Sequence, residues 1–239
     1  MTKFIAFVSG KGGVGKTTVT LNTGLALGKL GKKVVLLDAN VGTPNLSLHL
    51  GIMNPEHTLN QFLRKEKNLQ QITYMGDENI SFLFSSPSYA EYQKTNFKKF
   101  SEIFEHLDHQ SDFVLVDSPS GLGPEVNQVL KNTDEAIIVV NPNLSSVMDA
   151  LKTIQLAAAN KNIITGIVLN MSNFGGWNEL KPQEIEEILG YPIIANIKHN
   201  SKFRKAAHKQ NPLTTLYPRS ASVREFKKIA SNLALEGMR

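Results

Sequence analysis

Short runs of apolar residues alternate along the chain with segments of helical spacing. Runs rich in Val, Ile, Leu and Phe are typical of strands that are buried on both faces. These runs cover residues 4–8, 33–38, 80–84, 112–117, 135–140, 163–169 and 191–197. Between them, apolar residues three and four positions apart predict amphipathic helices. The helices are expected at residues 19–30, 58–63, 97–107, 145–156, 182–189, 202–209 and 222–235.

This alternation predicts an α/β fold. Strands that alternate with helices through nearly the whole chain favour a doubly wound, mostly parallel sheet with helices on both faces. At 239 residues, 41% of them hydrophobic and 20% charged, the chain is typical of one globular domain, which we expect to span residues 1–239. No apolar run approaches the roughly 20 residues of a membrane span, and we expect no signal peptide before the first strand. We therefore expect a cytoplasmic protein.

Two local signals refine the element ends. Ser145 is a residue type that caps helix N-termini, so we expect it to begin the helix at 145–156. The Gly-containing segment at 75–78 predicts a turn before the strand at 80–84.

A phosphate-binding pattern stands between the first strand and the first helix. Gly10, Gly15, Lys16 and Thr17 match G-x-x-x-x-G-K-[ST] without a gap. Glycines let the backbone curl so that several N–H groups face an anion, and the following helix adds its N-terminus. Lys16 would reach the β- and γ-phosphates, and the Thr17 hydroxyl would ligate Mg²⁺. The sequence therefore predicts a nucleotide-phosphate site.

Two acidic residues end apolar strands. Asp38 closes the strand at 33–38, and Asp117 closes the strand at 112–117. Because ligands of open α/β sheets bind at the carboxyl ends of the strands, we expect both carboxylates near the Mg²⁺ of a bound nucleotide. Gly121, four residues after Asp117, could offer its backbone N–H to a γ-phosphate because no Cβ blocks the approach.

The loop carries a second lysine, and this gives the pattern a closer match. Residues 11–18 read KGGVGKTT, which resembles the deviant Walker A loop of the MinD/ParA family of P-loop ATPases. In that family the early lysine, here Lys11, reaches across a homodimer interface to the partner's nucleotide. The resemblance therefore implies bound Mg·ATP and a homodimer in the ATP state. The ATP-binding residues implied are Gly10, Lys11, Gly12, Gly13, Val14, Gly15, Lys16, Thr17, Thr18, Gly121 and Asn170.

Individual roles follow from the same resemblance. Residues 117–121 match the family's D-[ST]-P-x-G switch II motif. Asn170, after the strand at 163–169, corresponds to the residue that reads adenine. The metal ligands implied are Thr17, Asp38 and Asp117, and the residues implied in catalysis are Lys11, Lys16, Asn40 and Asp117.

The chain departs from the family pattern at Asn40. The family has Asp-x-Asp at this place; Asp38 keeps the first acid, but Asn40 replaces the second, which positions the attacking water. An amide can orient water but cannot take its proton. We hypothesise a slow ATPase with a long-lived ATP state. The family also tends to have an acid at Asn143, and Pro-x-Asp where this chain has residues 198–200.

The resemblance is closest to MinD-like proteins, and it implies a nucleotide-timed switch. Such a switch recruits a protein partner, here unidentified, in cell-division or other intracellular positioning. The apolar face of the helix at 222–235 is expected to dock on the domain, and no membrane-targeting tail is evident beyond it. An ATP-stabilised scaffold with little hydrolysis is one alternative. A carrier of iron–sulfur clusters is disfavoured because the chain has no cysteine.

The basic end of the chain raises another alternative. Residues 198–239 hold ten Lys and Arg but two Glu, a net charge of +8 within a total of +5. Such a segment could hold nonspecific DNA, as in a ParA-like DNA-partitioning ATPase, or form a solvated face.

Overall fold

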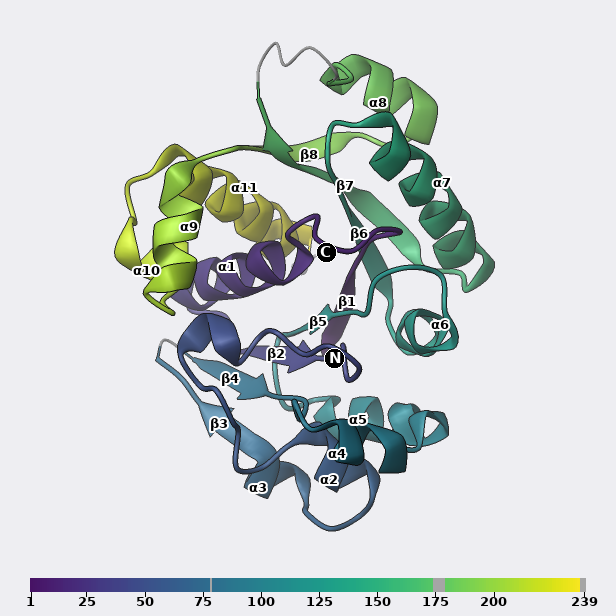
Figure 1. Cartoon of the computed structure of the whole chain (residues 1–239), viewed down its shortest axis with the longest axis vertical. Helices are drawn as coiled ribbons and strands as arrows, with labels where there is room; N and C mark the ends of the chain where they lie inside the picture. The colour runs from purple at the N-terminus through teal and green to yellow at the C-terminus, as the bar shows by residue number, and fades with distance from the viewer. Residues whose placement is uncertain (78, 174–178, 237–239) are drawn as a thin grey trace.

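An eight-stranded sheet runs through the centre of the computed structural model, which describes residues 1–77, 79–173 and 179–236 (Figure 1). The strand order is β3-β4-β2-β5-β1-β6-β7-β8, and every neighbouring pair is parallel except β3 with β4. The strands are β1 (Lys3–Val8), β2 (Val34–Asp38), β3 (Thr73–Met75), β4 (Ile80–Leu83), β5 (Phe113–Asp117), β6 (Glu135–Val140), β7 (Ile163–Ser172) and β8 (Ile193–Lys198). The predicted mostly parallel fold is confirmed.

Helices cover both faces of this sheet. The α-helices are α1 (Lys16–Lys29), α2 (Leu59–Leu63), α3 (Leu69–Ile72), α4 (Tyr89–Lys94), α5 (Phe100–Leu107), α6 (Pro124–Lys131), α7 (Leu144–Ala159), α8 (Pro182–Leu189), α9 (Ser201–His208), α10 (Leu213–Leu216) and α11 (Ala221–Glu236). Two 3-10 turns are η1 (Leu48–Leu50) and η2 (Phe97–Lys99). On one face α1 lies beside α11, and on the other lie α6 and α7 (Figure 1).

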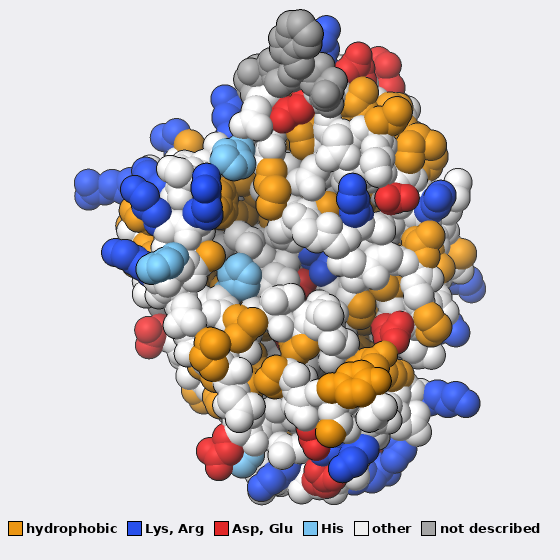
Figure 2. Space-filling model, in the orientation of Figure 1, with side chains coloured by type: hydrophobic (Ala, Val, Ile, Leu, Met, Phe, Trp, Pro, Cys, Tyr) orange, Lys and Arg blue, Asp and Glu red, His pale blue; other side chains and the backbone are white. Residues whose placement is uncertain are grey.

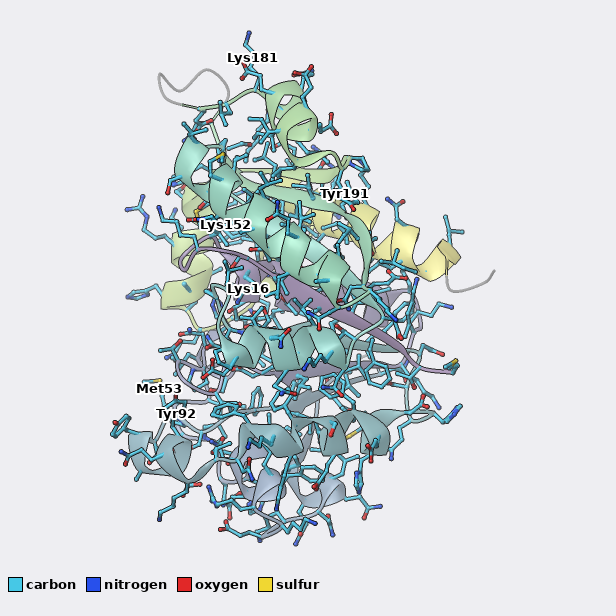
Figure 3. All side chains as sticks on the ribbon, turned by 90° about the vertical axis from the view of Figure 1, so that its right-hand side faces the viewer. Lys16, Met53, Tyr92, Lys152, Lys181 and Tyr191 are labelled. Atoms are coloured by element: carbon cyan, nitrogen blue, oxygen red, sulfur yellow. The ribbon has the colours of Figure 1, made fainter. Side chains whose placement is uncertain are left out.

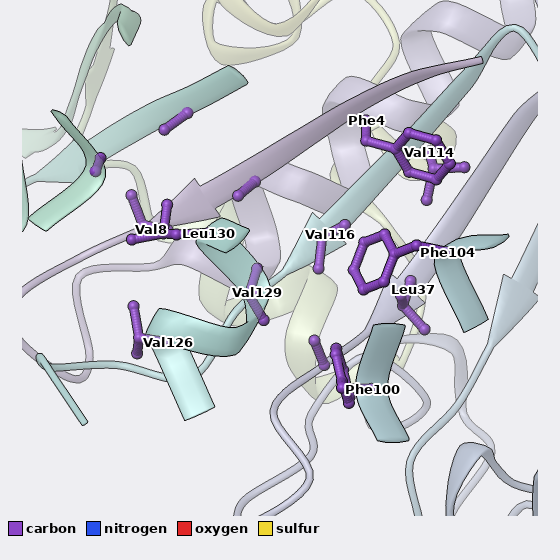
Figure 4. Close-up of a cluster of buried hydrophobic side chains, with 14 of the residues drawn as sticks. Phe4, Val8, Leu37, Phe100, Phe104, Val114, Val116, Val126, Val129 and Leu130 are labelled. Atoms are coloured by element: carbon purple, nitrogen blue, oxygen red, sulfur yellow. The ribbon is translucent and has the colours of Figure 1, made fainter. Parts of the chain in front are cut away.

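The strands are continuously apolar because both of their faces are buried. Along β1, Phe4 and Val8 pack with β5, α5 and α6 (Figure 4), whereas Ile5 and Phe7 point into the core beneath α1 and α11. The predicted apolar face of α11 is fully buried in that second core. Its residues are Val223, Phe226, Ile229, Ala230 and Leu233.

Several sequence predictions need correction. The N-cap of α7 is Asn143, whose side chain accepts a hydrogen bond from the Ser146 backbone N–H, so the prediction of Ser145 was wrong. β7 does not end at residue 169 but continues to Ser172, because a shift of register with Met171 at φ 59° lets it keep pairing with β8.

The sequence reading missed β3, α3, α4, α6 and α10, and four of these five are only three to six residues long. Such short elements leave little periodicity to detect. α6 did carry a signal, since Pro124 occupies its first turn. At the predicted turn at 75–78, the Gly76 N–H donates to the Ile80 carbonyl, and residue 78 lies outside the described residues.

Candidate nucleotide-binding site

The loop between β1 and α1 has the backbone that its glycines require. Gly13 and Gly15 have φ values of 78° and 88°, in the left-handed region that glycine adopts without strain. Gly10 packs against α7, where an added Cβ would lie 2.3 Å from the Asp149 carbonyl oxygen. We call the hollow above this loop the P-loop cavity; its volume is about 260 Å³. It is lined by Gly12, Gly13, Val14, Gly15, Lys16, Thr17, Thr18, Asn40, Thr43, Asn45, His49 and Ser120.

Lys16 lies in the interior of the molecule, near its middle (Figure 3). Its ammonium is 3.2 Å from Asp117 Oδ1 and donates a short hydrogen bond to the Ser118 carbonyl. The Thr17 hydroxyl donates to Asp117 Oδ2 at 2.6 Å. The two residues predicted to meet phosphate and metal are thus brought together on one buried carboxylate.

Asp38 ends β2 directly beside Asp117 at the end of β5, as predicted. Its carboxylate accepts backbone N–H bonds from Asn40, Asn45 and Leu46, at 3.0 to 3.1 Å. Complete burial raises the pKa of Asp38, and the nearby charge of Asp117 raises it further. Two buried carboxylates and a hydroxyl are hard oxygen donors of the kind Mg²⁺ prefers, so Thr17, Asp38 and Asp117 fit that ion.

Asn40 uses both ends of its amide within its own loop. Its Nδ2 donates to the Thr43 carbonyl at 2.6 Å, and its Oδ1 accepts from the Thr43 hydroxyl at 3.1 Å. Asn40 does line the P-loop cavity, as its predicted role requires. To contact a water in this cavity, Asn40 must use the second lone pair of Oδ1, or the loop must rearrange. The predicted water-orienting role of Asn40 stays a prediction.

Asn170 lies beneath the loop and is nearly fully buried. Its Nδ2 donates to the Val14 carbonyl at 2.7 Å, so the side chain fastens the P-loop to β7. It also lines a second hollow of about 190 Å³, which we call the Asn170 cavity. The other lining residues are Thr18, Met171, Lys198, His199, Asn200, Phe203 and Arg204. The amide oxygen and the second Nδ2 hydrogen of Asn170 remain available for an adenine, and its predicted role stays a prediction.

Two predicted residues show arrangements that the sequence did not reveal. The Gly121 N–H, predicted to meet a γ-phosphate, donates to the Ser9 carbonyl at 2.9 Å. Lys11 is exposed and does not line the P-loop cavity of its own chain. Its exposure is compatible with a lysine that reaches another molecule.

His49 belongs to the site, and the sequence reading missed it. The half-buried residue lies in η1 and lines the P-loop cavity. Burial lowers the pKa of its imidazole, an effect that the charge of Asp117 partly opposes. Ligand spacing could not identify this histidine; its position eleven residues after Asp38, in the chain that follows the loop of Asn40, was the only available signal.

Comparisons with known proteins agree with this geometry. The family model described as "ParA: NUBPL iron-transfer P-loop NTPase" matches residues 1–234. The ATP-binding protein MJ0547 of Methanocaldococcus jannaschii, itself uncharacterised, is 35% identical over 230 residues, which cover 96% of this chain and 86% of that protein. The septum site-determining protein MinD of Synechocystis is 30% identical over 247 residues, covering 98% and 90%.

Solved structures of MinD proteins are also similar to this chain. The septum site-determining protein MinD of Pyrococcus horikoshii, complexed with Mg-ADP, superposes with a TM-score of 0.94 at 31% identity and covers 100% of this chain and 98% of its own. The MinC:MinD cell division complex of Aquifex aeolicus has a TM-score of 0.87 at 28% identity, covering 98% and 96%. This chain belongs to the MinD/ParA family of P-loop NTPases.

Proposed function

We propose that this protein binds Mg·ATP in the P-loop cavity, forms a homodimer in that state, and hydrolyses the nucleotide slowly. The observation that carries the proposal is the cluster in which Lys16 and Thr17 meet Asp117, with Asp38 on the adjacent strand. It places a cation, a hydroxyl and two carboxylates beneath a loop of backbone amides, which suits a magnesium-bound triphosphate. The MinD structure with Mg-ADP supports the choice of ligand.

A homodimer that forms only with bound ATP would make the recruitment of a protein partner depend on the nucleotide. Exposed Lys11 and the exposed apolar side chains of Leu122, Leu144 and Met148 flank the loops around the site. A second copy on this face would cover them and let Lys11 reach the facing nucleotide. The complex of MinD with MinC is the precedent for a protein partner in cell-division placement.

Light scattering tests the switch directly. We expect a monomer with ADP and a dimer with a non-hydrolysable ATP analogue, while a malachite-green assay records slow phosphate release. A monomer under both conditions would contradict the dimer. A dimer that releases no phosphate would favour the ATP-stabilised scaffold.

We attribute the proposed slow hydrolysis of ATP to Asn40. We expect Asn40→Asp to raise the single-turnover rate, because a carboxylate can take the proton that the amide cannot. Since Asp also cannot donate to the Thr43 carbonyl, Asn40→Ala is the matched control that loses the same bond. A rate for Asn40→Asp equal to or below that of the native protein would count against this explanation.

A ParA-like, DNA-binding function is the second candidate, and the basic end of the chain favours it. Blue side chains gather over α9 in the space-filling view (Figure 2). The described exposed cations of α9 and its C-terminal end include Arg204, Lys205 and Lys209. DNA binding that requires ATP and falls steeply with salt would support this function. The absence of DNA binding at low salt would rule out this second function.

Among the described residues, no helix is both long and apolar enough to cross a membrane.

A further inference from the structure

We infer that His49 holds the attacking water of ATP hydrolysis by accepting a hydrogen bond from it. This inference rests on the proposed ATPase function and adds a residue to that site. Among the described residues that line the P-loop cavity there is no Asp or Glu, and His49 is the one side chain able to take a proton at neutral pH.

Several other polar groups at the cavity are already hydrogen-bonded, and the remaining ones, on Thr18, Asn45 and Ser120, cannot take a proton at neutral pH. Lys16 is a donor only, and the Thr17 hydroxyl is bonded to Asp117. Asn40 and Thr43 bond each other. By contrast, no hydrogen bond to either ring nitrogen of His49 is found within residues 1–77, 79–173 and 179–236. An imidazole nitrogen is therefore left to meet a water.

The backbone holds His49 beside the metal-site acid. Asp38 Oδ2 accepts the N–H groups of Asn45 and Leu46, and the Asn45 carbonyl accepts the N–H of His49 at 3.2 Å. Two hydrogen bonds thus link the His49 backbone to a carboxylate predicted to hold Mg²⁺. The turn that carries the ring is therefore tied to the predicted metal site, as the backbone of a water-positioning residue must be.

The chemical step balances with the residues present. The water oxygen forms a bond to the γ-phosphorus, while the bond to the β–γ bridging oxygen breaks and leaves its electron pair on ADP. The proton of the water passes to the neutral imidazole and from there to solvent. Burial favours that neutral form, since it lowers the pKa of His49.

Three substitutions of His49 test the inference, each compared by kcat and by affinity for a fluorescent ATP analogue. His49→Leu keeps the bulk but removes the acceptor, so we expect kcat to fall at least about tenfold, with affinity changed less than about twofold. His49→Gln keeps an acceptor for the water but cannot take its proton, so its rate should fall between those of the native protein and His49→Leu. His49→Ala should regain activity when free imidazole is added. The matched control is His208→Leu, an exposed histidine at the end of α9 that lines neither cavity.

The outcomes separate this inference from the proposed function. A native protein that hydrolyses ATP while His49→Leu does so equally fast would overturn the role of His49 alone. Equal losses of rate and affinity, without rescue by imidazole, would mean that His49 only shapes the wall, and would also overturn it. A native protein that binds ATP and releases no phosphate would remove the hydrolysis itself, and the role of His49 with it.

Discussion

The two cavities on either side of Gly15 are built in different ways. The P-loop cavity is walled by consecutive backbone from Gly12 to Thr18 and floored by charged groups that pair below it. The Asn170 cavity is walled mostly by side chains that come from β7, β8 and α9. A cavity of backbone amides tolerates few changes of spacing, whereas a cavity of side chains can change residue by residue. The match to the family pattern at residues 10–18 and the departure from it at 198–200 agree with this difference.

Removal of the Lys16 ammonium is expected to have the largest effect. Lys16→Ala deletes the predicted charged donor to phosphate and leaves Asp117 buried beside Asp38 without its cation. Two charge-assisted hydrogen bonds are worth about 3–6 kcal/mol, so we expect ATP affinity to fall about a hundredfold or more. Fluorescence titration with an ATP analogue measures this, and Lys131→Ala, at an exposed lysine that ends α6, is the control. A fall in hydrolysis with unchanged ATP affinity would contradict the phosphate role of Lys16.

Gly15 lines the P-loop cavity and faces Asn170 of the other cavity, so a methyl group there should disturb both. Gly15→Ala forces a left-handed alanine and places its Cβ 2.3 Å from Asn170 Nδ2. Gly31 has a similar φ of 80° but open space around it, so Gly31→Ala isolates the backbone cost of about 1–2 kcal/mol. We expect Gly15→Ala to cost about 1 kcal/mol more, because Asn170 must leave the Val14 carbonyl. Urea unfolding measures the free energy of unfolding of both variants. Equal losses of stability would show that the Asn170 side chain moves aside at no cost.

Sequence was a good guide wherever the backbone alone determines the outcome. The curl of residues 10–18 follows from its glycines, and Asp38 lies beside Asp117 because parallel strands end at one edge of the sheet. Apolar periodicity gave seven of the eight described strands and the buried face of α11.

Sequence did not reveal which nearby partner a polar group takes. The amide of Asn40 closes on Thr43, and the N–H of Gly121 bonds Ser9, because the loops fold back on themselves. His49 reaches the P-loop cavity through the path of the chain after β2, which no local spacing encodes. Such partners depend on three-dimensional proximity that periodicity does not contain.

A smaller effect is expected from the neighbouring carboxylates of Asp38 and Asp117, which should make the stability of the protein depend on pH. The pKa of Asp38 is raised above its ordinary 3.8, so the folded protein binds more protons than the unfolded chain above that pH. Stability of the nucleotide-free protein therefore falls as pH rises toward neutrality, by at most about 1.4 kcal/mol per pH unit. Mg²⁺ between the carboxylates would offset this loss. We expect Mg·ADP to raise Tm more at pH 8 than at pH 5.5; equal increments would contradict the assignment of Asp38 to the metal.

The smallest effect is expected in the Asn170 cavity, where one side chain has two functions. Asn170→Ala removes the bond to the Val14 carbonyl, at a cost of about 1 kcal/mol, and also the amide oxygen that would accept from the amino group of adenine. We expect about a tenfold loss of ATP affinity and a smaller preference for ATP over GTP, because guanine has no amino group at that position. Phe203→Leu, on the α9 side of the same cavity, is the control that keeps the amide. In the Asn170→Ala background, the cost of Gly15→Ala should approach that of Gly31→Ala, since only a contact of 3.2 Å with the flexible end of Met171 remains. A preference for ATP that survives Asn170→Ala would place the reading of the base elsewhere and leave Asn170 only the task of fastening the loop.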